Sequence, residues 1–150
     1  MTLRYFEDLA VGQKFASPTL SVDADAITAF AAQFDPQPFH LDDAAARHTV
    51  FEGLAASGWH TAALTMRLCV ASDFRPAGGI LGIGGELNWL KPVRPGDELR
   101  VEIEVIEMRP SRSRPGQGIA RIRVTTLNQD GEPVQTFTPT IFVDRRDRRP

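Results

Sequence analysis

Residues 57–72, SGWHTAALTMRLCVAS, form the longest apolar stretch of the chain. Between Gly58 and Ser72 the only charged residue is Arg67, and no proline interrupts the segment. Ser57 is a favoured N-cap residue, so the stretch predicts a helix that begins at Gly58. A helix that is apolar nearly all round is usually buried, and we therefore expect this helix at the centre of the fold.

After this segment the apolar pattern changes from the period of a helix to the period of a strand. Strands are expected at residues 81–89, 99–105, 120–124 and 134–143. In 99–105 apolar and charged side chains alternate, which is typical of a half-buried strand. Residues 128–131, NQDG, indicate a hairpin turn. Pro139 places the last strand at a sheet edge or at a bulge.

Before the apolar segment the pattern is helical. Residues 26–34 place Ile27, Phe30, Ala31 and Phe34 on one helical face. Pro36 and Pro38 end that helix and start a loop. Helices in the first half and antiparallel strands in the second half predict one α+β domain over residues 1–150, in which a curved sheet wraps the buried helix.

The loop after the first helix carries an acid and an imidazole, in Asp35-Pro36-Gln37-Pro38-Phe39-His40. On a continuous helix Asp35 and His40 would point about 140° apart, whereas a loop can fold them onto one point. A carboxylate and an imidazole that share a water can take a proton from it, and burial can raise the pKa of such a carboxylate. On chemistry alone, a turn or cap role is the commoner one for Asp35.

Ser57-Gly58 adds a group that can stabilise negative charge. Backbone N–H groups at a helix N-terminus are ready donors to a developing oxyanion. Glycine at position 58 has no Cβ, which lets a substrate carbonyl approach closely. The alternative is that Gly58 only begins the helix.

Composition excludes several classes of protein. The chain has 150 residues, 42% hydrophobic and 24% charged, with a net charge of −2, so neither nucleic acid nor an acidic membrane is an expected partner. Cys69 is alone and no apolar run approaches the ~20 residues that span a bilayer, so we expect a cytoplasmic protein. Residues 145–150 predict a solvated basic tail. The histidine spacings match no zinc site, so no metal is expected.

Taken together, these residues resemble the MaoC-like hydratase/dehydratase family, which includes the R-specific enoyl-CoA hydratases. Its members carry an Asp-x-Asn-Pro-x-His motif and a later glycine at the start of the central helix. Here Asp35 to His40 matches the motif and Gly58 matches the glycine, while residues 88–97 resemble the family's strand and turn. One departure is Gln37 in place of the asparagine. If its amide orients His40 or lines the substrate tunnel, acyl-chain preference would differ.

The resemblance implies a single hot-dog fold, usually paired into homodimers or higher homo-oligomers. It also implies the reversible hydration of a trans-2-enoyl-CoA in fatty-acid metabolism, with no cofactor besides the coenzyme A of the substrate. Asp35 and His40 would handle the water and the proton at C2. The Gly58 N–H would stabilise the thioester oxyanion, and Gln37 and Ser57 would shape the substrate site.

Two alternatives remain open at this point. One is dehydration of a 3-hydroxyacyl group on acyl carrier protein, or of a branched or dicarboxylic hydroxyacyl-CoA. The other is a non-catalytic acyl-thioester-binding protein. A thioesterase is disfavoured because residues 58–72 contain no carboxylate. Arg112 and Arg114 match the geometry of phosphate oxygens and are candidates for binding coenzyme A, although a solvated loop explains them equally well.

Overall fold

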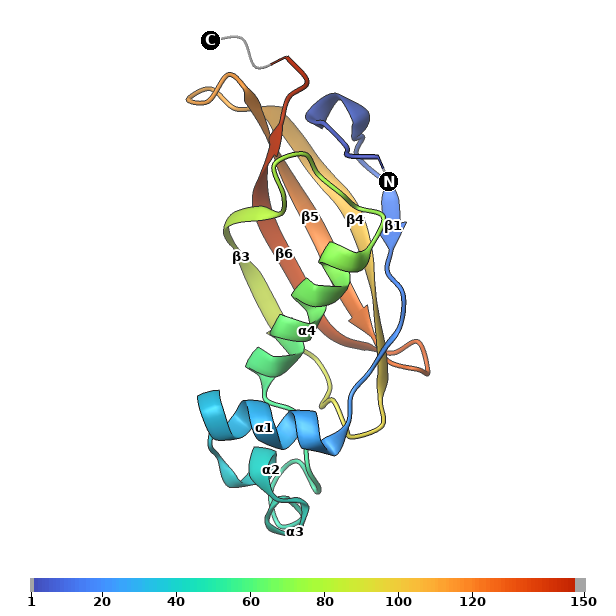
Figure 1. Cartoon of the computed structure of the whole chain (residues 1–150), viewed down its shortest axis with the longest axis vertical. Helices are drawn as coiled ribbons and strands as arrows, with labels where there is room; N and C mark the ends of the chain where they lie inside the picture. The colour runs from blue at the N-terminus through green and yellow to red at the C-terminus, as the bar shows by residue number, and fades with distance from the viewer. Residues whose placement is uncertain (1, 148–150) are drawn as a thin grey trace.

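The computed structural model describes residues 2–147. Its elements are the 3-10 helix η1 (Phe6–Asp8), β1 (Lys14–Ala16), β2 (Leu20–Ser21), α1 (Ala24–Phe34), α2 (Pro38–Leu41), α3 (Asp43–Ala46), α4 (Gly58–Ala71), β3 (Leu81–Trp89), β4 (Glu98–Pro110), β5 (Gln117–Leu127) and β6 (Pro133–Asp144). The antiparallel sheet has the order β1-β4-β5-β6-β3, with β2 paired to β4, and it curves around α4 (Figure 1). This arrangement confirms the α+β fold with a sheet wrapped around a central helix.

Helix α4 begins where the sequence predicts. The Ser57 side chain accepts from the Trp59 N–H at 3.3 Å and caps the helix. The buried face of α4 includes Leu68 and Cys69, which join the core formed by the inward side chains of the sheet. The helix is not buried all round, however, because Met66 is 38% and Val70 62% exposed. An apolar stripe of α4 therefore faces away from the core of this chain.

The long hairpin of β4 and β5 follows the predicted alternation. Val101, Ile103 and Val105 are buried, while the charged residues between them face outward. On the outer face Arg123 pairs with Glu104 at 3.7 Å, across the ladder that joins the two strands. The sheet thus has one apolar face for α4 and one charged face.

Strand β6 is an inner strand, so the expectation that Pro139 marks a sheet edge is wrong, whereas an irregularity does occur beside it: the pairing of β3 with β6 shifts register between Gly82 and Gly84. Strand β6 lies between β5 and β3. Pro139 stands opposite Gly85 of β3, and the pairing of β6 with β5 is interrupted between Phe137 and Thr140. A proline has no N–H to give to a ladder, and the interruption lies where that donor is missing.

The segment before α4 folds into three short helices at one end of the sheet (Figure 1). Asp23 caps α1 by accepting from the Ala26 N–H at 2.7 Å. The expected loop after α1 instead contains the four-residue helix α2, with Pro38 in its first turn, where a missing N–H costs nothing. Asp42 caps α3.

The C-terminal arginines are docked onto the N-terminal segment. Arg145 Nε donates to Glu7 Oε1 at 3.1 Å, and Arg146 Nη2 donates to both carboxylate oxygens of Asp8. Both arginines of the expected basic tail thus pair with acids while their side chains stay 36% and 59% exposed. The last three residues of that tail, 148–150, lie outside the described range.

Strand β3 forms one edge of the sheet and is largely exposed. It pairs with β6 on one side, and no strand among residues 2–147 pairs with its other side. Leu81 and Ile83 are 50% and 55% exposed.

Within residues 2–147, no helix has the length and apolar character needed to cross a bilayer.

Candidate active site

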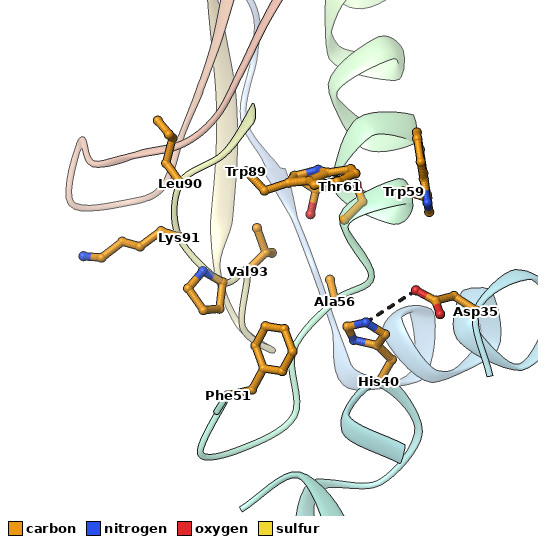
Figure 2. A pocket seen from close by; sticks show the side chains of 12 residues that line it. Asp35, His40, Phe51, Ala56, Trp59, Thr61, Trp89, Leu90, Lys91 and Val93 are labelled. Carbon is orange, nitrogen blue, oxygen red and sulfur yellow. Dashed lines mark hydrogen bonds and ion pairs between the residues drawn. The ribbon is translucent and has the colours of Figure 1, made fainter. Parts of the chain in front are cut away.

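The end of the molecule that holds α1 and α2 contains a cavity of about 390 Å³. Asp35, at the C-cap of α1, and His40, on α2, lie on one wall of this site cavity (Figure 2). Phe51, Ala56, Gly58, Trp59, Thr61, Trp89, Leu90, Lys91, Pro92 and Val93 line the rest. The first turn of α4 and the segment after β3 thus close over the two residues that the sequence singles out.

His40 is held in one orientation by its neighbours. Its side chain is only 5% exposed, and its Nδ1 lies 2.6 Å from the carbonyl oxygen of Ala55. Since a carbonyl can only accept, Nδ1 carries a proton and the neutral ring has its lone pair on Nε2. That Nε2 lies 3.4 Å from Asp35 Oδ2. Phe39 and Phe51 pack against the ring.

Asp35 is oriented by two donors. Ser57 Oγ donates to Oδ2 at 2.7 Å, and Gln37 Nε2 donates to Oδ1 at 2.5 Å. Burial raises the pKa of Asp35, but the hydrogen bonds from Ser57 and Gln37, together with the positive charge of the His40 ring when it is protonated, outweigh it and hold the pKa below its ordinary value. The expected upward tuning of this carboxylate is therefore wrong, and Asp35 is ionised at neutral pH.

The pair presents two acceptors to one point. The ionised Asp35 can only accept, and the His40 tautomer that donates to Ala55 accepts at Nε2 when the ring is neutral. A water beside the pair can donate one hydrogen to each acceptor, which leaves its oxygen lone pairs directed elsewhere. Such a water is oriented as a nucleophile, with bases in place for its proton.

Gly58 contacts an aromatic ring closely. A Cβ on this residue would lie 2.5 Å from Cε2 of Trp89, so the indole needs the glycine. Trp89 Nε1 also donates to the Gly58 carbonyl at 2.9 Å. The Gly58 N–H finds no acceptor among residues 2–147 and lies at the N-terminus of α4. The N–H thus stays available as a donor, while the missing Cβ is explained by Trp89.

Gln37 and Ser57 stand behind Asp35, outside the lining of the site cavity. Ser57 is fully buried and links Asp35 to the N-terminus of α4, because its oxygen also caps that helix. The sequence suggested that the Gln37 amide orients His40 or lines the substrate tunnel. In the structure this amide donates to Asp35 instead. Both side chains therefore orient the carboxylate.

The loop that carries Ala55 depends on contacts that the sequence motif does not reveal. One guanidinium, that of Arg94, donates to the carbonyls of Phe51, Gly53 and Leu54. Asp43 Oδ1 accepts from the Leu54 N–H at 3.0 Å. These contacts hold the carbonyl that fixes His40. The only signal in the sequence was that Arg94 lies in the stretch resembling the family's strand and turn.

Arg112 and Arg114 are not near the site within one chain. They lie in the connection between β4 and β5, at the end of the sheet away from α1 and α2 (Figure 1). The Arg114 guanidinium sits 4.7 Å from the ring centroid of Phe142. Their role in binding coenzyme A stays a prediction that needs a second chain.

Other reactive side chains lie apart from the cavity. Burial raises the pKa of the Cys69 thiol to about 12, so this thiol is protonated at neutral pH. Among residues 2–147 no cluster of three or more histidine, cysteine, aspartate or glutamate side chains is arranged to hold a metal ion.

Fold and site together define a hot-dog protein with an acid–histidine pair beside a helix N-terminus. The family model of the MaoC like domain matches residues 7–128. A MaoC-like dehydratase from Rhodospirillum rubrum is 57% identical, with a TM-score of 0.93, over 96% of this chain and 99% of that one. An (R)-specific enoyl-CoA hydratase from Aeromonas caviae is 36% identical over 91% of this chain and 85% of its own. A 3-hydroxybutyryl-CoA dehydratase from Methylorubrum extorquens is 34% identical over 73% and 69%. The chain belongs to the MaoC-like domain family.

Proposed function

We propose that the protein is a hydro-lyase that adds water reversibly to a trans-2-enoyl-CoA. The observation that supports this most strongly is the pair of acceptors, Asp35 Oδ2 and His40 Nε2, 3.4 Å apart on the wall of the site cavity. The Gly58 N–H at the start of α4 supplies a hydrogen-bond donor for negative charge on the thioester oxygen. A nucleophilic water and an oxyanion donor are what conjugate addition to a thioester needs.

In the hydration direction, the water held by the pair attacks C3 of the enoyl thioester. A C3–O bond forms, the C2=C3 π electrons move towards the thioester oxygen, and one water proton passes to the pair. The Gly58 N–H stabilises the charge on that oxygen. The enolate then collapses and takes a proton from the pair at C2, which gives the 3-hydroxyacyl thioester and restores the site. Dehydration follows the same steps in reverse.

The names of the relatives support both directions. The Aeromonas caviae relative is named a hydratase and the Methylorubrum extorquens relative a dehydratase of a CoA thioester. We therefore propose a CoA thioester, with no cofactor besides its own coenzyme A, as the substrate. A role in fatty-acid metabolism and a cytoplasmic location go with this substrate as part of the proposal.

We further propose that the active form is a homodimer built on β3. This edge strand exposes Leu81 and Ile83 in the chain by itself, and the stripe of α4 with Met66 and Val70 is also uncovered. An exposed apolar edge is a template for pairing with another strand. Antiparallel pairing of two β3 strands would continue the sheet across a two-fold axis.

Such a dimer would bring the distant arginines close to the site of the other chain. In antiparallel pairing, the start of one β3 lies beside the end of the other, so Leu81 of one chain approaches Trp89 of the other. Leu81 stands opposite Phe142, and Arg114 covers the Phe142 ring. Arg114 and the neighbouring Arg112 would thus lie where the phosphates of a bound coenzyme A can reach them.

The absorbance band of the enoyl thioester tests the proposal directly. With crotonyl-CoA and longer substrates, we expect the band to disappear without release of a free thiol. A release of free thiol would identify a thioesterase. If the band persists with every chain length, the protein binds acyl thioesters without reacting, and the hydratase proposal is wrong.

A further inference from the structure

Arg94 holds a loop beside the site without lining the site cavity itself. Its Nη1 donates to the carbonyls of Gly53 and Leu54 at 2.9 Å and 3.3 Å, and its Nη2 donates to the carbonyl of Phe51. A guanidinium offers five N–H donors in a rigid fork, which suits several acceptors that lie around one point. Arg94 therefore acts on residues 51–56, the clamped loop, and not on the cavity directly.

The turn that carries Arg94 fixes its position. The Arg94 backbone N–H donates to Asp97 Oδ2 at 2.8 Å, and the Arg94 carbonyl accepts from the Asp97 N–H at 3.1 Å. The other carboxylate oxygen of Asp97 accepts from Gln129 Nε2 at 3.1 Å. Asp97 is only 8% exposed, so these contacts are shielded from water. The guanidinium thus extends from a rigid base.

The clamped loop needs the contacts that hold it. Glu52 has a φ of 58°, in the left-handed region that a residue other than glycine enters at a cost. Such a conformation persists only where the surrounding structure imposes it. The residues before and after Glu52, which are Phe51 and Gly53, both give their carbonyls to Arg94. The guanidinium is therefore what holds this part of the loop in its strained shape.

The clamped loop reaches the site through the Ala55 peptide. The Ala55 N–H donates to the Phe39 carbonyl at 3.1 Å, and the Ala55 carbonyl lies 2.6 Å from His40 Nδ1. The hydrogen bond made by one ring nitrogen of a histidine decides which nitrogen carries the proton. Without that carbonyl the proton can sit on Nε2 and donate to Asp35 Oδ2, 3.4 Å away. His40 would then no longer accept a hydrogen from the water.

We propose that Arg94 is a positioning residue of the active site. By fixing the clamped loop it keeps the Ala55 carbonyl on His40 Nδ1, and so keeps Nε2 free to accept a proton from the attacking water. The inference rests on the proposed hydratase function, but the tautomer of His40 can be measured without substrate. Because Arg94 does not line the site cavity, its loss should lower kcat more than it raises KM.

The first measurement is nitrogen NMR of the three histidine rings at about pH 8.5, where an ordinary histidine is neutral. The signals of His40 are assigned by their absence from the spectrum of His40→Ala. In the wild type we expect one tautomer, with the proton on Nδ1. In Arg94→Ala, and to a smaller extent in Arg94→Lys, both tautomers should be populated, because an ammonium cannot present the same fork of donors.

The second measurement is the rate of crotonyl-CoA hydration. Arg94→Ala should lower kcat by roughly 100-fold, because a catalytic group misplaced by about 1 Å costs that much, and Arg94→Lys should lower it by about 10-fold. KM should stay within about threefold of the wild type in both variants, as expected for a group that binds no substrate. If Arg94→Ala does not fold, Arg94→Lys decides by the same two measurements.

Arg4 supplies the matched control. It is also half-buried, and its Nε donates to the Asp73 carbonyl at 3.1 Å, beyond the end of α4 that lies away from Gly58. Arg4→Ala should keep the wild-type tautomer of His40 and a kcat within about twofold of the wild type. A retained Nδ1–H tautomer or an unchanged kcat in the Arg94 variants would overturn the inference. A wild type that hydrates no enoyl-CoA would instead reject the proposed function, while the tautomers would still decide whether Arg94 holds His40.

Discussion

The Ser57 hydroxyl makes two hydrogen bonds, and the effect of losing each one can be measured. Its oxygen caps α4, and its hydrogen goes to Asp35 Oδ2. In Ser57→Ala we expect kcat for enoyl-CoA hydration to fall by about 10- to 100-fold, because a hydrogen bond to a charged group is worth roughly 1.5–3 kcal/mol. The lost cap should lower the free energy of unfolding by about 1 kcal/mol.

Ser72 at the other end of α4 provides the matched control. It is equally buried, donates to the Cys69 carbonyl and accepts from the Phe74 N–H, far from Asp35. Ser72→Ala should destabilise the fold to a similar extent while leaving kcat within about twofold of the wild type. Similar rates for the two alanine variants would show that Ser57 acts only through stability.

His60 makes the stability of the fold depend on pH. Its ring stacks on Phe30 at 4.7 Å, is buried, and has no partner for Nδ1 among residues 2–147. Burial lowers the pKa of His60, so the folded chain binds this proton less readily than the unfolded chain. Its stabilising contribution is complete above the ordinary pKa of about 6.5 and is lost as pH falls below that value through the lowered pKa.

His60→Phe, which keeps a ring against Phe30, should remove this dependence. Between about pH 7.5 and pH 5.5, urea unfolding should show the wild type losing up to about 1.4 kcal/mol per pH unit more than the variant. Titration of the remaining histidines is common to both proteins and cancels in the difference. Equal losses would mean that His60 takes up a proton in the folded state without penalty.

At the scale of elements, α4 and β3 are joined by the contact between Gly58 and Trp89. Gly58→Ala places a methyl group inside the indole and should cost about 1–3 kcal/mol of unfolding free energy, as overpacking does. In a Trp89→Leu background the same change should cost less, because the obstructing ring is gone. A double-mutant cycle measures this coupling, and strictly additive costs would contradict the contact.

The elements differ in how readily the sequence predicts them. The cap at Ser57 and the alternation of residues 99–105 depend on local patterns, and both are confirmed. Helix α2 was missed because two prolines were interpreted only as breakers, although Pro38 fits the first turn of a helix. The inner position of β6 depends on which strands pair, and a proline in one strand does not determine that.

In the site, too, local sequence motifs were predicted and contacts made by the tertiary fold were not. The family resemblance predicted that Asp35 and His40 act together, and the structure brings them within 3.4 Å. The lowered pKa of Asp35 was not foreseen, because it depends on donors that the fold brings in. The carbonyl of Ala55 and the guanidinium of Arg94 were missed for a related reason, since a backbone contact and a link across 40 residues leave no local pattern.

At the scale of the whole molecule, the proposed dimer can be tested by one substitution that should halve the molar mass in solution. Ile83 on the free edge of β3 is 55% exposed, and Ile83→Lys should give a monomer because an edge lysine blocks strand pairing. Val11, which is 63% exposed in a turn before β1, supplies the control Val11→Lys. Light scattering after size exclusion should find a dimer for the control. A dimer in both variants would place the interface elsewhere.

The central claim is that Asp35 and His40 form one water-activating unit. The most direct test is kcat for crotonyl-CoA hydration in Asp35→Asn, His40→Ala and the double variant, with Asp42→Asn as the control. Asp42 lies two residues from His40 and caps α3, a role that asparagine also fills. We predict losses of at least about 100-fold in each single variant and no further multiplicative loss in the double variant, with the control near wild type. Equal rates in all five proteins would contradict the account.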